Sequence, residues 1–313
     1  MKVIDRKQLV REAYQYGREL TLKNPEYRVR AMAFLEGKLR RDTGSGDITT
    51  NLLIQPGQES EAVIIAKENG VIAGLEEVTA FYQSHGLRTR AHAGDGEMVK
   101  DGQTLLSLHG RVRDSLRVER SSLNFLEAMS GIATNTKKYV DAFQTYGIAI
   151  AATRKEVADE HLEKKAVYLG GGLTHRLGLD GFILAKDNHF KALRQAGEKD
   201  PVSAAIEKAY DSAYQGPVEV EADSREEALA AAEKFASYGG LHGRIIPIIM
   251  LDNMQLEMMK DVTTLIRNHA LVEVSGNITL DNLKEYGAVG ADVVSTSSLN
   301  RRSEPLDLSF TLA

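Results

Sequence analysis

Apolar side chains recur at helical spacing in two parts of the chain. Between residues 120 and 147, Leu123, Leu126 and Met129 are followed by further apolar positions about one turn apart, which predicts a long amphipathic helix. Residues 1 to about 40 show the same period and are also predicted to be helical. The glycines at positions 44 and 46 then interrupt the pattern and predict a break.

Residues 52–117 have a different pattern, in which short runs of β-favouring residues alternate with turn signals. The pairs Asn69-Gly70 and Asp101-Gly102 are typical of tight turns between strands. One helical stretch is predicted within GLEEVTAFYQSHG, at residues 74–86. The region is therefore predicted to be a small β-rich module with one helix.

After residue 147 the pattern changes again, to apolar runs separated by helical stretches. This alternation predicts parallel strands with crossover helices, and the runs are apolar enough to be buried on both faces. With so many units, a closed α/β barrel is favoured over an open sheet. The six runs are GIAIAATRK (147–155), GFILAKDNH (181–189), VEVEADS (218–224), RIIPIIMLDNM (244–254), ALVEVSGN (270–277) and ADVVSTSSL (291–299).

Composition removes several classes of protein. The 313-residue chain has no cysteine, which excludes disulfides, thiolate zinc sites and a cysteine nucleophile. Its formal net charge of -5 argues against a surface built to bind nucleic acid. No apolar run approaches the length of a membrane span, and the charged start lacks a signal-peptide core. A cytoplasmic protein with no membrane partner is therefore expected.

The polar residues at the ends of the six runs indicate what the barrel would bind, because the chemistry of such barrels lies at the carboxyl ends of the strands. Cations come first, carboxylates follow, and small residues come last. Cations suit carboxylates or phosphates, carboxylates suit magnesium or sugar hydroxyls, and Ser/Gly ends that lead into a helix suit a phosphate. Together they predict a phosphorylated sugar with magnesium beside a small anion. The cationic ends are Arg154, Lys155 and Lys186 with the preceding His175 and Arg176; the carboxylates are Glu219, Glu221 and Asp252; the small residues are Ser275, Gly276 and Ser295 to Ser298.

Each of these residues also has a purely structural interpretation. A single arginine or lysine at a strand end is commonly solvated or salt-bridged, and Ser-Gly before a helix is commonly an N-cap. His189 is expected to be a capping residue. Glu219 and Glu221 share one strand face, so at least one should point into the barrel, where an unpaired carboxylate is costly. It is the co-occurrence of these residues that favours a binding site.

Seven motifs in order along the chain resemble the quinolinate phosphoribosyltransferase family, the carboxylating nicotinate-nucleotide pyrophosphorylases. The most specific is GGG-x-x-HRLGL followed by KDNH. The motifs are GDITT (46–50), ERSSLNFLEAMSGIAT (119–134), TRK (153–155), GGGLTHRLGL (170–179), KDNH (186–189), VEVE (218–221) and MLDN (250–253).

The resemblance implies an α/β fold with an N-terminal α/β sandwich and a C-terminal, seven-stranded α/β barrel. The corresponding domains would be residues 1–118, residues 119–299, and a tail at 300–313 that returns toward the N-terminal domain. It also implies phosphoribosyl transfer from phosphoribosyl pyrophosphate to quinolinate with decarboxylation, which gives nicotinate mononucleotide, a step of NAD biosynthesis. The implied cofactor is Mg²⁺, and the implied assembly is a homodimer, or a larger homo-oligomer of dimers, with the active site at the interface.

The family's site residues can be carried over where the motifs match. The residues that would hold the dicarboxylate are Arg154, His175, Arg176 and Lys186, with Arg120 from the other subunit. Lys155 would meet the pyrophosphate, Glu221 and Asp252 would take the ribose hydroxyls and magnesium, and Ser275 and Gly276 would bind the 5′-phosphate.

The chain departs from the family pattern in three segments, and these departures keep other functions open. Residues 152–161 lack the acid before TRK and the arginine after it and contain additional acids; Asn277 replaces a glycine; and residues 295–302 lack a glycine but contain hydroxyls and two arginines. The segment FASYGGLHGRIIP (235–247) is longer than usual. Two alternatives to quinolinate phosphoribosyl transfer remain: a paralogue with another aromatic-acid acceptor, and a non-catalytic phosphate- or nucleotide-binding protein.

Overall fold

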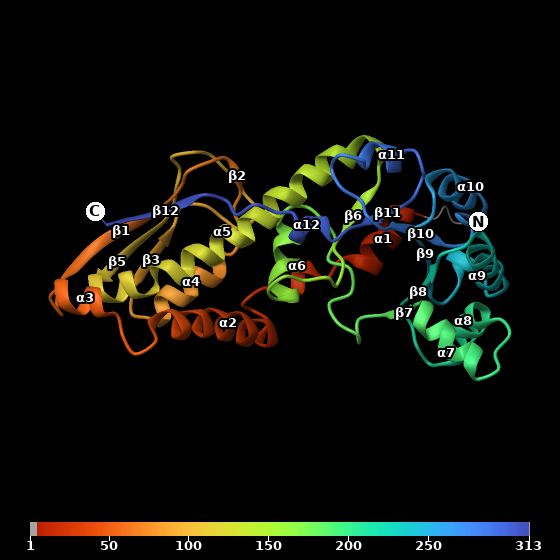
Figure 1. Ribbon diagram of the computed structural model, residues 1–313, viewed down its shortest axis with the longest axis horizontal. Coiled ribbons are helices and arrows are strands. Elements are labelled where there is room, and N and C mark those ends of the chain that lie inside the picture. The colour runs from red at the N-terminus through yellow and green to blue at the C-terminus, as the bar shows by residue number, and fades with distance from the viewer. Residues whose placement is uncertain (1–4, 313) are drawn as a thin grey trace. The chain divides into compact units, whose positions relative to one another are not determined.

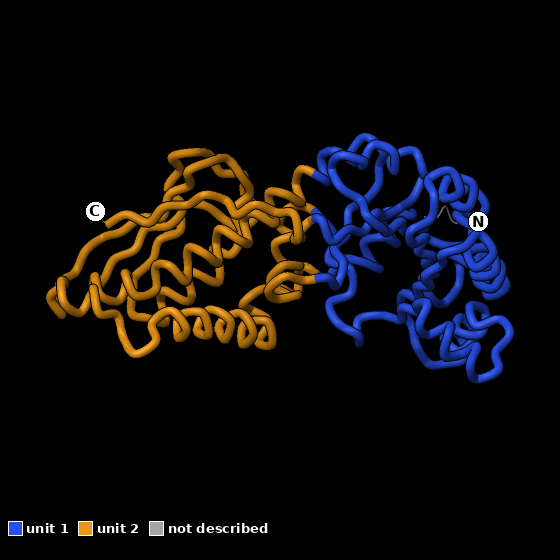
Figure 2. The backbone as a smooth tube through the Cα atoms, in the orientation of Figure 1, with its two compact units in different colours: residues 1–16, 139–155, 172–298 blue, residues 17–138, 156–171, 299–313 orange. Residues whose placement is uncertain are grey.

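The computed structural model describes residues 5–312 (Figure 1). The chain forms two compact units, and both are discontinuous in sequence (Figure 2). Unit 1 contains residues up to Tyr16, residues 139–155 and residues 172–298; unit 2 contains residues 17–138, residues 156–171 and residues from Leu299 onward. The predicted domain boundary at residues 118 and 119 falls inside one long helix, α5 (Val112–Phe143).

Unit 1 is built on a parallel sheet of six strands in the order β6-β11-β10-β9-β8-β7. All six correspond to the six predicted apolar runs. Leu173 adds a single parallel bridge to Ala151 of β6, so it occupies the place of a seventh strand. The strands are β6 (Ala149–Ala151), β7 (Ile183–Ala185), β8 (Pro217–Ala222), β9 (Ile246–Asp252), β10 (Leu271–Ser275) and β11 (Val293–Ser295). The predicted α/β barrel is confirmed.

Helices of unit 1 pack along the sheet and against one another; among them α8 and α9 contact β8, and α10 packs on α9. The first helix, α1 (Arg6–Tyr14), buries Val10, Ala13 and Tyr14 in one cluster with residues of β6, β9, β10 and β11 and with Leu173. The other helical elements are η2 (Gln144–Tyr146), α7 (Asp187–Gln195), α8 (Pro201–Asp211), α9 (Arg225–Ser237), η3 (Gly240–His242), α10 (Leu256–Ile266) and α11 (Leu283–Gly287).

The long segment noticed at residues 235–247 lies within unit 1. It contains η3, and the ring of Tyr238 stacks on Tyr210 of α8 with the centroids 4.0 Å apart and the planes at 10°. Stacking of this kind fixes the loop against α8.

Unit 2 is an antiparallel four-stranded sheet, in the order β12-β1-β5-β3, with helices packed on it. α4 packs on β3, and α2 packs on α4, which gives the predicted α/β sandwich. The last strand, β12, pairs with β1. The elements are η1 (Gly17–Glu19), α2 (Pro25–Thr43), α3 (Ile48–Leu53), β1 (Glu59–Ala66), β2 (Gly70–Val71), α4 (Leu75–Ser84), β3 (Arg88–Ala91), β4 (Met98–Val99), β5 (Thr104–Arg111), α5, α6 (Glu160–Leu169) and β12 (Leu308–Leu312); α12 (Ser298–Arg301) joins the two units.

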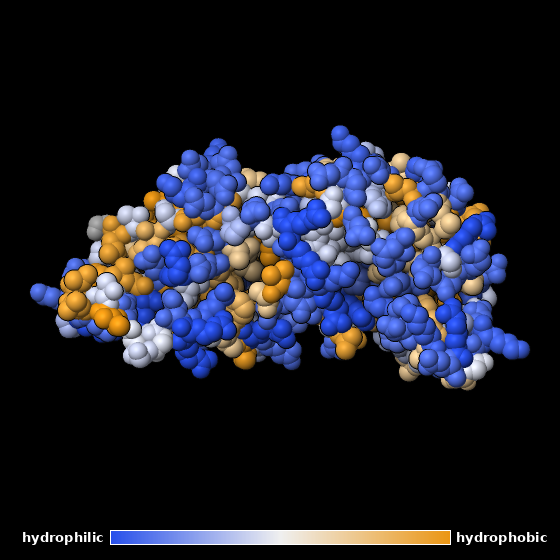
Figure 3. All heavy atoms as spheres, viewed as in Figure 1, coloured by the Kyte–Doolittle hydropathy of each residue, from blue (hydrophilic) through white to orange (hydrophobic). Residues whose placement is uncertain are grey.

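Two local features of unit 2 follow from its sequence. The short helix α3 is capped by the Asp47 side chain, which accepts a hydrogen bond from the Thr50 amide at 2.9 Å. On its outer face Ile48, Leu52 and Leu53 are exposed, and apolar atoms gather there (Figure 3).

Among residues 5–312 no helix combines the length and the apolar character that a membrane crossing requires.

Candidate active site

A cavity of about 280 Å³ opens at the carboxyl ends of the unit 1 strands. Because parallel strands end at one edge, polar residues that follow different strands meet there. Nine of the ten predicted site residues belong to unit 1, and eight of them line this cavity; the ninth, Gly276, is next to one of its lining residues. The lining residues are Ala152, Thr153, Arg154, Lys155, His175, Arg176, Leu184, Lys186, Glu221, Met250, Asp252, Glu273, Ser275 and Ser295.

The cations of the cavity come from three segments. Arg154 and Lys155 follow β6 and are exposed, and Lys186 follows β7 with its side chain 43% exposed. The Nζ atom of Lys186 lies 2.8 Å from Oε2 of Glu221, at the end of β8. His189 accepts a hydrogen bond from the Lys186 amide at 3.0 Å, so its predicted capping role is confirmed. The capped turn fixes the backbone from which Lys186 reaches the cavity.

His175 and Arg176 belong to the segment of residues 172–176, which we call the acceptor segment. Gly171 precedes it with φ at 90°, and His175 itself has φ at 55°, in the left-handed region that a residue with a Cβ rarely adopts. Arg176 is buried, donates to the Phe182 carbonyl at 3.0 Å and lies over the Phe182 ring at 5.8 Å. The turn thus brings the imidazole of His175 and the guanidinium of Arg176 to the wall of the cavity.

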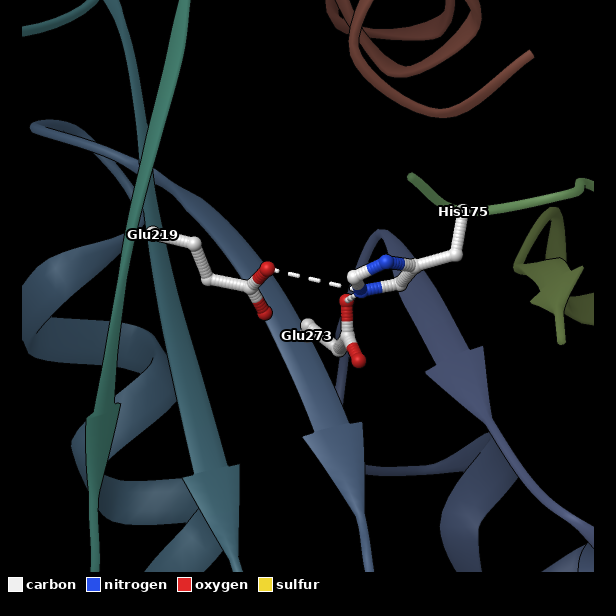
Figure 4. Close-up of side chains that lie close together, drawn as sticks. All are labelled: His175, Glu219 and Glu273. Carbon is white, nitrogen blue, oxygen red and sulfur yellow. Dashed lines mark ion pairs between the residues drawn. The ribbon is translucent and has the colours of Figure 1, made fainter. Parts of the chain in front are cut away.

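The imidazole of His175 meets two buried carboxylates inside the barrel (Figure 4). Its Nε2 atom lies 3.4 Å from Oε2 of Glu219 and 3.6 Å from Oε2 of Glu273, and both glutamates are fully buried. Burial alone lowers the pKa of His175, but the two carboxylates outweigh it and raise that pKa to about 9. The imidazole is therefore positively charged at neutral pH. At least one of Glu219 and Glu221 was expected to point into the barrel, and Glu219 does so and is paired there.

The two glutamates respond differently to the same surroundings. Burial and the nearby Glu273 raise the pKa of Glu219 to about 7. Burial also raises that of Glu273, but the His175 charge outweighs it and leaves the pKa of Glu273 below its usual value. Glu273 was not predicted as a site residue. The only signal was a charged residue in an apolar run, in LVEVSG, which is the kind of residue that needs a buried partner.

Glu221 and Asp252 supply hard oxygen ligands at the ends of two neighbouring strands. Both carboxylates line the cavity, and Oδ2 of Asp252 accepts a hydrogen bond from Nδ2 of Asn253 at 2.6 Å. Magnesium prefers one or two carboxylates together with substrate phosphates. Glu221 and Asp252 are therefore the predicted residues that could hold a magnesium ion, and Glu221 is paired with Lys186.

The turn after β10 uses two residues with positive φ. Gly276 has φ at 112°, and a Cβ on it would lie 2.5 Å from Oδ1 of Asn253, so this position requires glycine. Asn277 has φ at 50° and takes the left-handed conformation in place of the family's glycine. The helix predicted after Ser275-Gly276 is α11, which begins at Leu283 after this turn.

The hydroxyl-rich segment after β11 supports the same turn. Thr296 Oγ1 and Ser298 Oγ donate to the Ile278 carbonyl at 2.7 and 2.9 Å. These hydroxyl hydrogens are engaged inside the fold. The oxygen of Thr296 also accepts from the Ser298 amide at 3.1 Å.

Comparisons with known proteins identify the family. The model described as the quinolinate phosphoribosyl transferase C-terminal domain matches residues 132–311, and that of the N-terminal domain matches residues 47–130. The chain belongs to the quinolinate phosphoribosyltransferase family. The resemblance inferred from the motifs is confirmed.

Relatives in this family cover nearly the whole chain. A probable carboxylating nicotinate-nucleotide pyrophosphorylase of Methanothermobacter thermautotrophicus is 33% identical over 290 residues, which is 90% of this chain and 98% of the relative. One of Synechocystis is 36% identical over 287 residues, 89% of this chain and 91% of the relative. The crystal structure of NadC from Streptococcus pyogenes matches with a TM-score of 0.78 and 33% identity, over 91% of this chain and 98% of that one.

A more distant structure, human nicotinic acid phosphoribosyltransferase, has a TM-score of 0.57 at 14% identity, over 90% of this chain and 74% of that one. This likeness concerns the fold alone.

Arg120, the remaining predicted site residue, lies in unit 2 on α5, with an exposed side chain. Because the cavity is lined by unit 1 alone, the predicted role of Arg120 stays a prediction.

The acids that distinguish residues 156–161 from the family pattern also lie in unit 2, and two have structural partners there. Asp159 caps α6 by accepting from the His161 amide at 3.0 Å, and Glu160 pairs with Lys164 at 3.1 Å. Glu163 accepts hydrogen bonds from the Val157 amide at 2.8 Å and from the amide after it. The segment is therefore held by hydrogen bonds from backbone amides to carboxylates.

A second acidic cluster in unit 2 has a structural explanation. Glu76, Glu77 and Asp95 bring carboxylate oxygens close enough together to hold a metal ion. Lys165 lies among them, with Nζ 2.6 Å from Glu76 and 3.8 Å from Asp95, and Tyr27 donates to Glu77 at 2.8 Å. The ammonium group of Lys165 already provides the positive charge that such a cluster needs.

Proposed function

We propose that this protein transfers the phosphoribosyl group of phosphoribosyl pyrophosphate to quinolinate and releases the 2-carboxylate as carbon dioxide. The products are nicotinate mononucleotide and pyrophosphate. The observation that carries the proposal is the cavity at the barrel mouth, which is lined by five cationic side chains and by the carboxylates of two neighbouring strand ends. The names of relatives with 33% and 36% identity support it.

The acceptor would be held by Arg154, His175, Arg176 and Lys186. Quinolinate carries carboxylates on adjacent ring carbons, and a set of four cations around one small cavity matches two such anions. Arginine can bind one carboxylate through two parallel hydrogen bonds, and this fixes the plane of the pyridine ring. Fixing the plane aims the ring nitrogen at the anomeric carbon, which lowers the entropy cost of the reaction.

The donor would lie at the carboxylate side of the cavity. Glu221 and Asp252 would hold Mg²⁺ and the ribose hydroxyls, and Ser275 with Gly276 would meet the 5′-phosphate. When bound, the metal ion supplies charge that neutralises the pyrophosphate. Lys155, at the same mouth, would add a positive charge to that leaving group. Glu221 also favours the positive charge that develops on the ribose.

The proposed reaction needs no side-chain nucleophile, because the ring nitrogen of quinolinate itself attacks the anomeric carbon. The lone pair of the ring nitrogen forms the bond to the anomeric carbon as the bond to pyrophosphate breaks. The ring nitrogen becomes positive, so the electron pair left at ring carbon 2 by the departing carbon dioxide is stabilised beside it and takes up a proton. Arg154, His175, Arg176 and Lys186 would bind the carboxylates, and the altered segment at 156–161 supplies none of these groups.

Arg120 would act in the site of a second copy of the chain, so the functional unit would be a homodimer or a larger assembly of dimers. The residue is exposed on α5, and one of its neighbours on the same helix face, Asn124, is also exposed. An exposed arginine of this kind is available to a partner subunit.

The experiment is an assay of the purified protein with phosphoribosyl pyrophosphate, magnesium and either quinolinate or nicotinate, in which the nucleotide product and carbon dioxide are measured. We expect magnesium-dependent turnover of quinolinate with one carbon dioxide per nucleotide. Turnover of nicotinate but not of quinolinate, or of neither acid by a folded protein, would contradict the proposal. The second of these outcomes would favour another acceptor or a binding role.

A further inference from the structure

The acceptor segment pairs with the barrel sheet through one residue. Residues 172–176 carry His175 and Arg176, and Leu173 bridges Ala151 through two backbone hydrogen bonds, from its amide to the Ile150 carbonyl at 2.7 Å and from the Ala152 amide to its carbonyl at 2.9 Å. His175 is also held in a left-handed conformation, which persists only where surrounding contacts impose it. The rest of the segment is held by side-chain contacts, which include the ion pairs of His175 with Glu219 and Glu273 and further contacts from outside the sheet.

The contacts from outside the sheet come from the end of the N-terminal helix. The Thr174 hydroxyl donates to the Tyr14 carbonyl at 3.0 Å and accepts from the Tyr16 amide at 2.9 Å. The Gln15 side chain donates to the Gly172 carbonyl at 3.3 Å. Thr174 is fully buried, so neither of its bonds can be replaced by bulk water.

Tyr14 adds a packing contact to the same link. Its buried ring meets the His175 ring edge to face, with centroids 5.2 Å apart and planes at 74°. The imidazole is thereby confined between Tyr14, the Phe182 ring at 5.1 Å and the carboxylates of Glu219 and Glu273.

The helix that carries Tyr14 is itself fixed to the barrel. Arg6, in the first turn of α1, pairs with Asp292 and donates to the carbonyls of Arg267 and Ala270 at 2.6 and 2.9 Å. Asp292 also accepts from the Val272 amide at 2.7 Å. Helix α1 is thus attached at both ends, to the amino side of the strands and to the acceptor segment.

We propose that Tyr14 and Thr174 are positioning residues for the acceptor: they fix residues 172–176 so that His175 and Arg176 are presented to the acceptor's carboxylates. This inference rests on the proposed function, since it concerns the dicarboxylate site. It assigns the N-terminal helix to the active site, although no residue of that helix lines the cavity. Neither residue lines the cavity, so we expect them to affect acceptor affinity through His175 and Arg176.

The test is Thr174→Val, which keeps the shape of the side chain and removes both hydrogen bonds. We expect the dissociation constant of quinolinate to rise about tenfold, and that of magnesium–phosphoribosyl pyrophosphate to change by less than about twofold. Thr174→Ser restores the hydroxyl and should restore affinity. Thr263→Val is the matched control, because Thr263 is buried in α10 and its hydroxyl has no hydrogen-bond partner among residues 5–312.

A second variant, Tyr14→Leu, removes the ring edge from His175 without changing the acceptor segment and should also weaken the binding of quinolinate selectively.

Hydrogen exchange provides a readout that does not depend on substrate: amides of residues 172–176 should exchange faster in Thr174→Val than in the wild type or Thr263→Val. Unchanged exchange and unchanged quinolinate affinity would overturn the inference. An equal loss of quinolinate and phosphoribosyl pyrophosphate binding would also overturn it, since that indicates a general structural role.

Failure of the proposed function has a different signature. If the wild-type protein binds no quinolinate, the substrate assignment fails. Faster exchange confined to residues 172–176 in Thr174→Val would then still support the link between α1 and the acceptor segment. Unchanged exchange in that variant would overturn the link as well as the substrate assignment.

Discussion

Replacing Glu273 by glutamine tests how the barrel keeps His175 charged. The side chain of Glu273 is fully buried, and its Oε2 lies 3.6 Å from Nε2 of His175. Glutamine keeps the shape and removes the charge. Because the folded-state pKa of about 9 lies above the usual 6.5, the protonated imidazole contributes stability that is fully present below pH 6.5. This contribution is lost as the pH rises through 9.

The magnitude follows from the distance. At an effective dielectric constant of about 20, two charges 3.6 Å apart interact by about 5 kcal/mol, which corresponds to roughly three pH units. Part of this is compensated, because Glu219 ionises more readily once the neighbouring charge is gone. We therefore expect the pKa of His175 to fall from about 9 by at least about one pH unit in Glu273→Gln.

The assay is an NMR titration of protein labelled at histidine, in which His175→Gln identifies the resonance. In the wild type the His175 ring should titrate near pH 9, and in Glu273→Gln clearly lower. Quinolinate should bind the variant at least about twofold more weakly at pH 8, because a pKa lowered by about one unit leaves only about half of the imidazole protonated, and it should recover most of its affinity at pH 6. Glu233→Gln, an exposed change on α9, is the control. A wild-type His175 that titrates at or below 6.5, or a value unaffected by Glu273→Gln, would refute the reasoning.

Three further predictions concern the turns and the assembly. Gly276→Ala should lower the free energy of unfolding by about 1–3 kcal/mol in urea, because its Cβ would meet Asn253 at a positive φ; an unchanged free energy would show that the turn can adapt. Glu163→Gln should lower the thermal midpoint by a few degrees, since its carboxylate binds loop amides, and an equal midpoint would contradict that role. Inactive Arg120→Ala and Lys186→Ala chains, mixed and refolded together, should recover about a quarter of wild-type activity if the sites are shared between subunits. No recovery from heterodimers would argue against sharing.

Much of the fold could be predicted from periodicity. All six apolar runs became the strands of the parallel sheet, because strands buried on both faces leave continuous apolar stretches. The start of α5 was harder to predict: the helix begins at Val112, eight positions before the predicted start at residue 120. It follows directly from β5, and the glycine nearest to the boundary, Gly110, lies inside that strand. Residues 1–4 of the predicted N-terminal helical region lie outside the described residues.

The site was predictable where chemistry follows strand ends, as at Lys186, Glu221 and Asp252. It was not predictable where tertiary packing decides the neighbours. Tyr14 lies in an N-terminal helix, about 160 residues from His175 in the chain. From the sequence alone, its aromatic ring cannot be distinguished from one in an ordinary core position. Glu273 lies in an apolar run, and only the fold brings it to the imidazole. The local sequence pattern identifies the residues at the end of each strand, but it carries little information about which distant residues they contact.

The measurement that tests the central claim most directly is the affinity of quinolinate relative to nicotinate, which lacks the 2-carboxylate. Calorimetry would compare wild type, Lys186→Met and the control Lys191→Met, whose lysine is exposed and pairs with Asp187 on α7. If the barrel mouth binds both carboxylates, quinolinate should bind the wild type and the control at least about tenfold more tightly than nicotinate, and this preference should largely disappear in Lys186→Met. Equal affinity of the two acids for the wild type, or a preference that survives in Lys186→Met, would contradict the account.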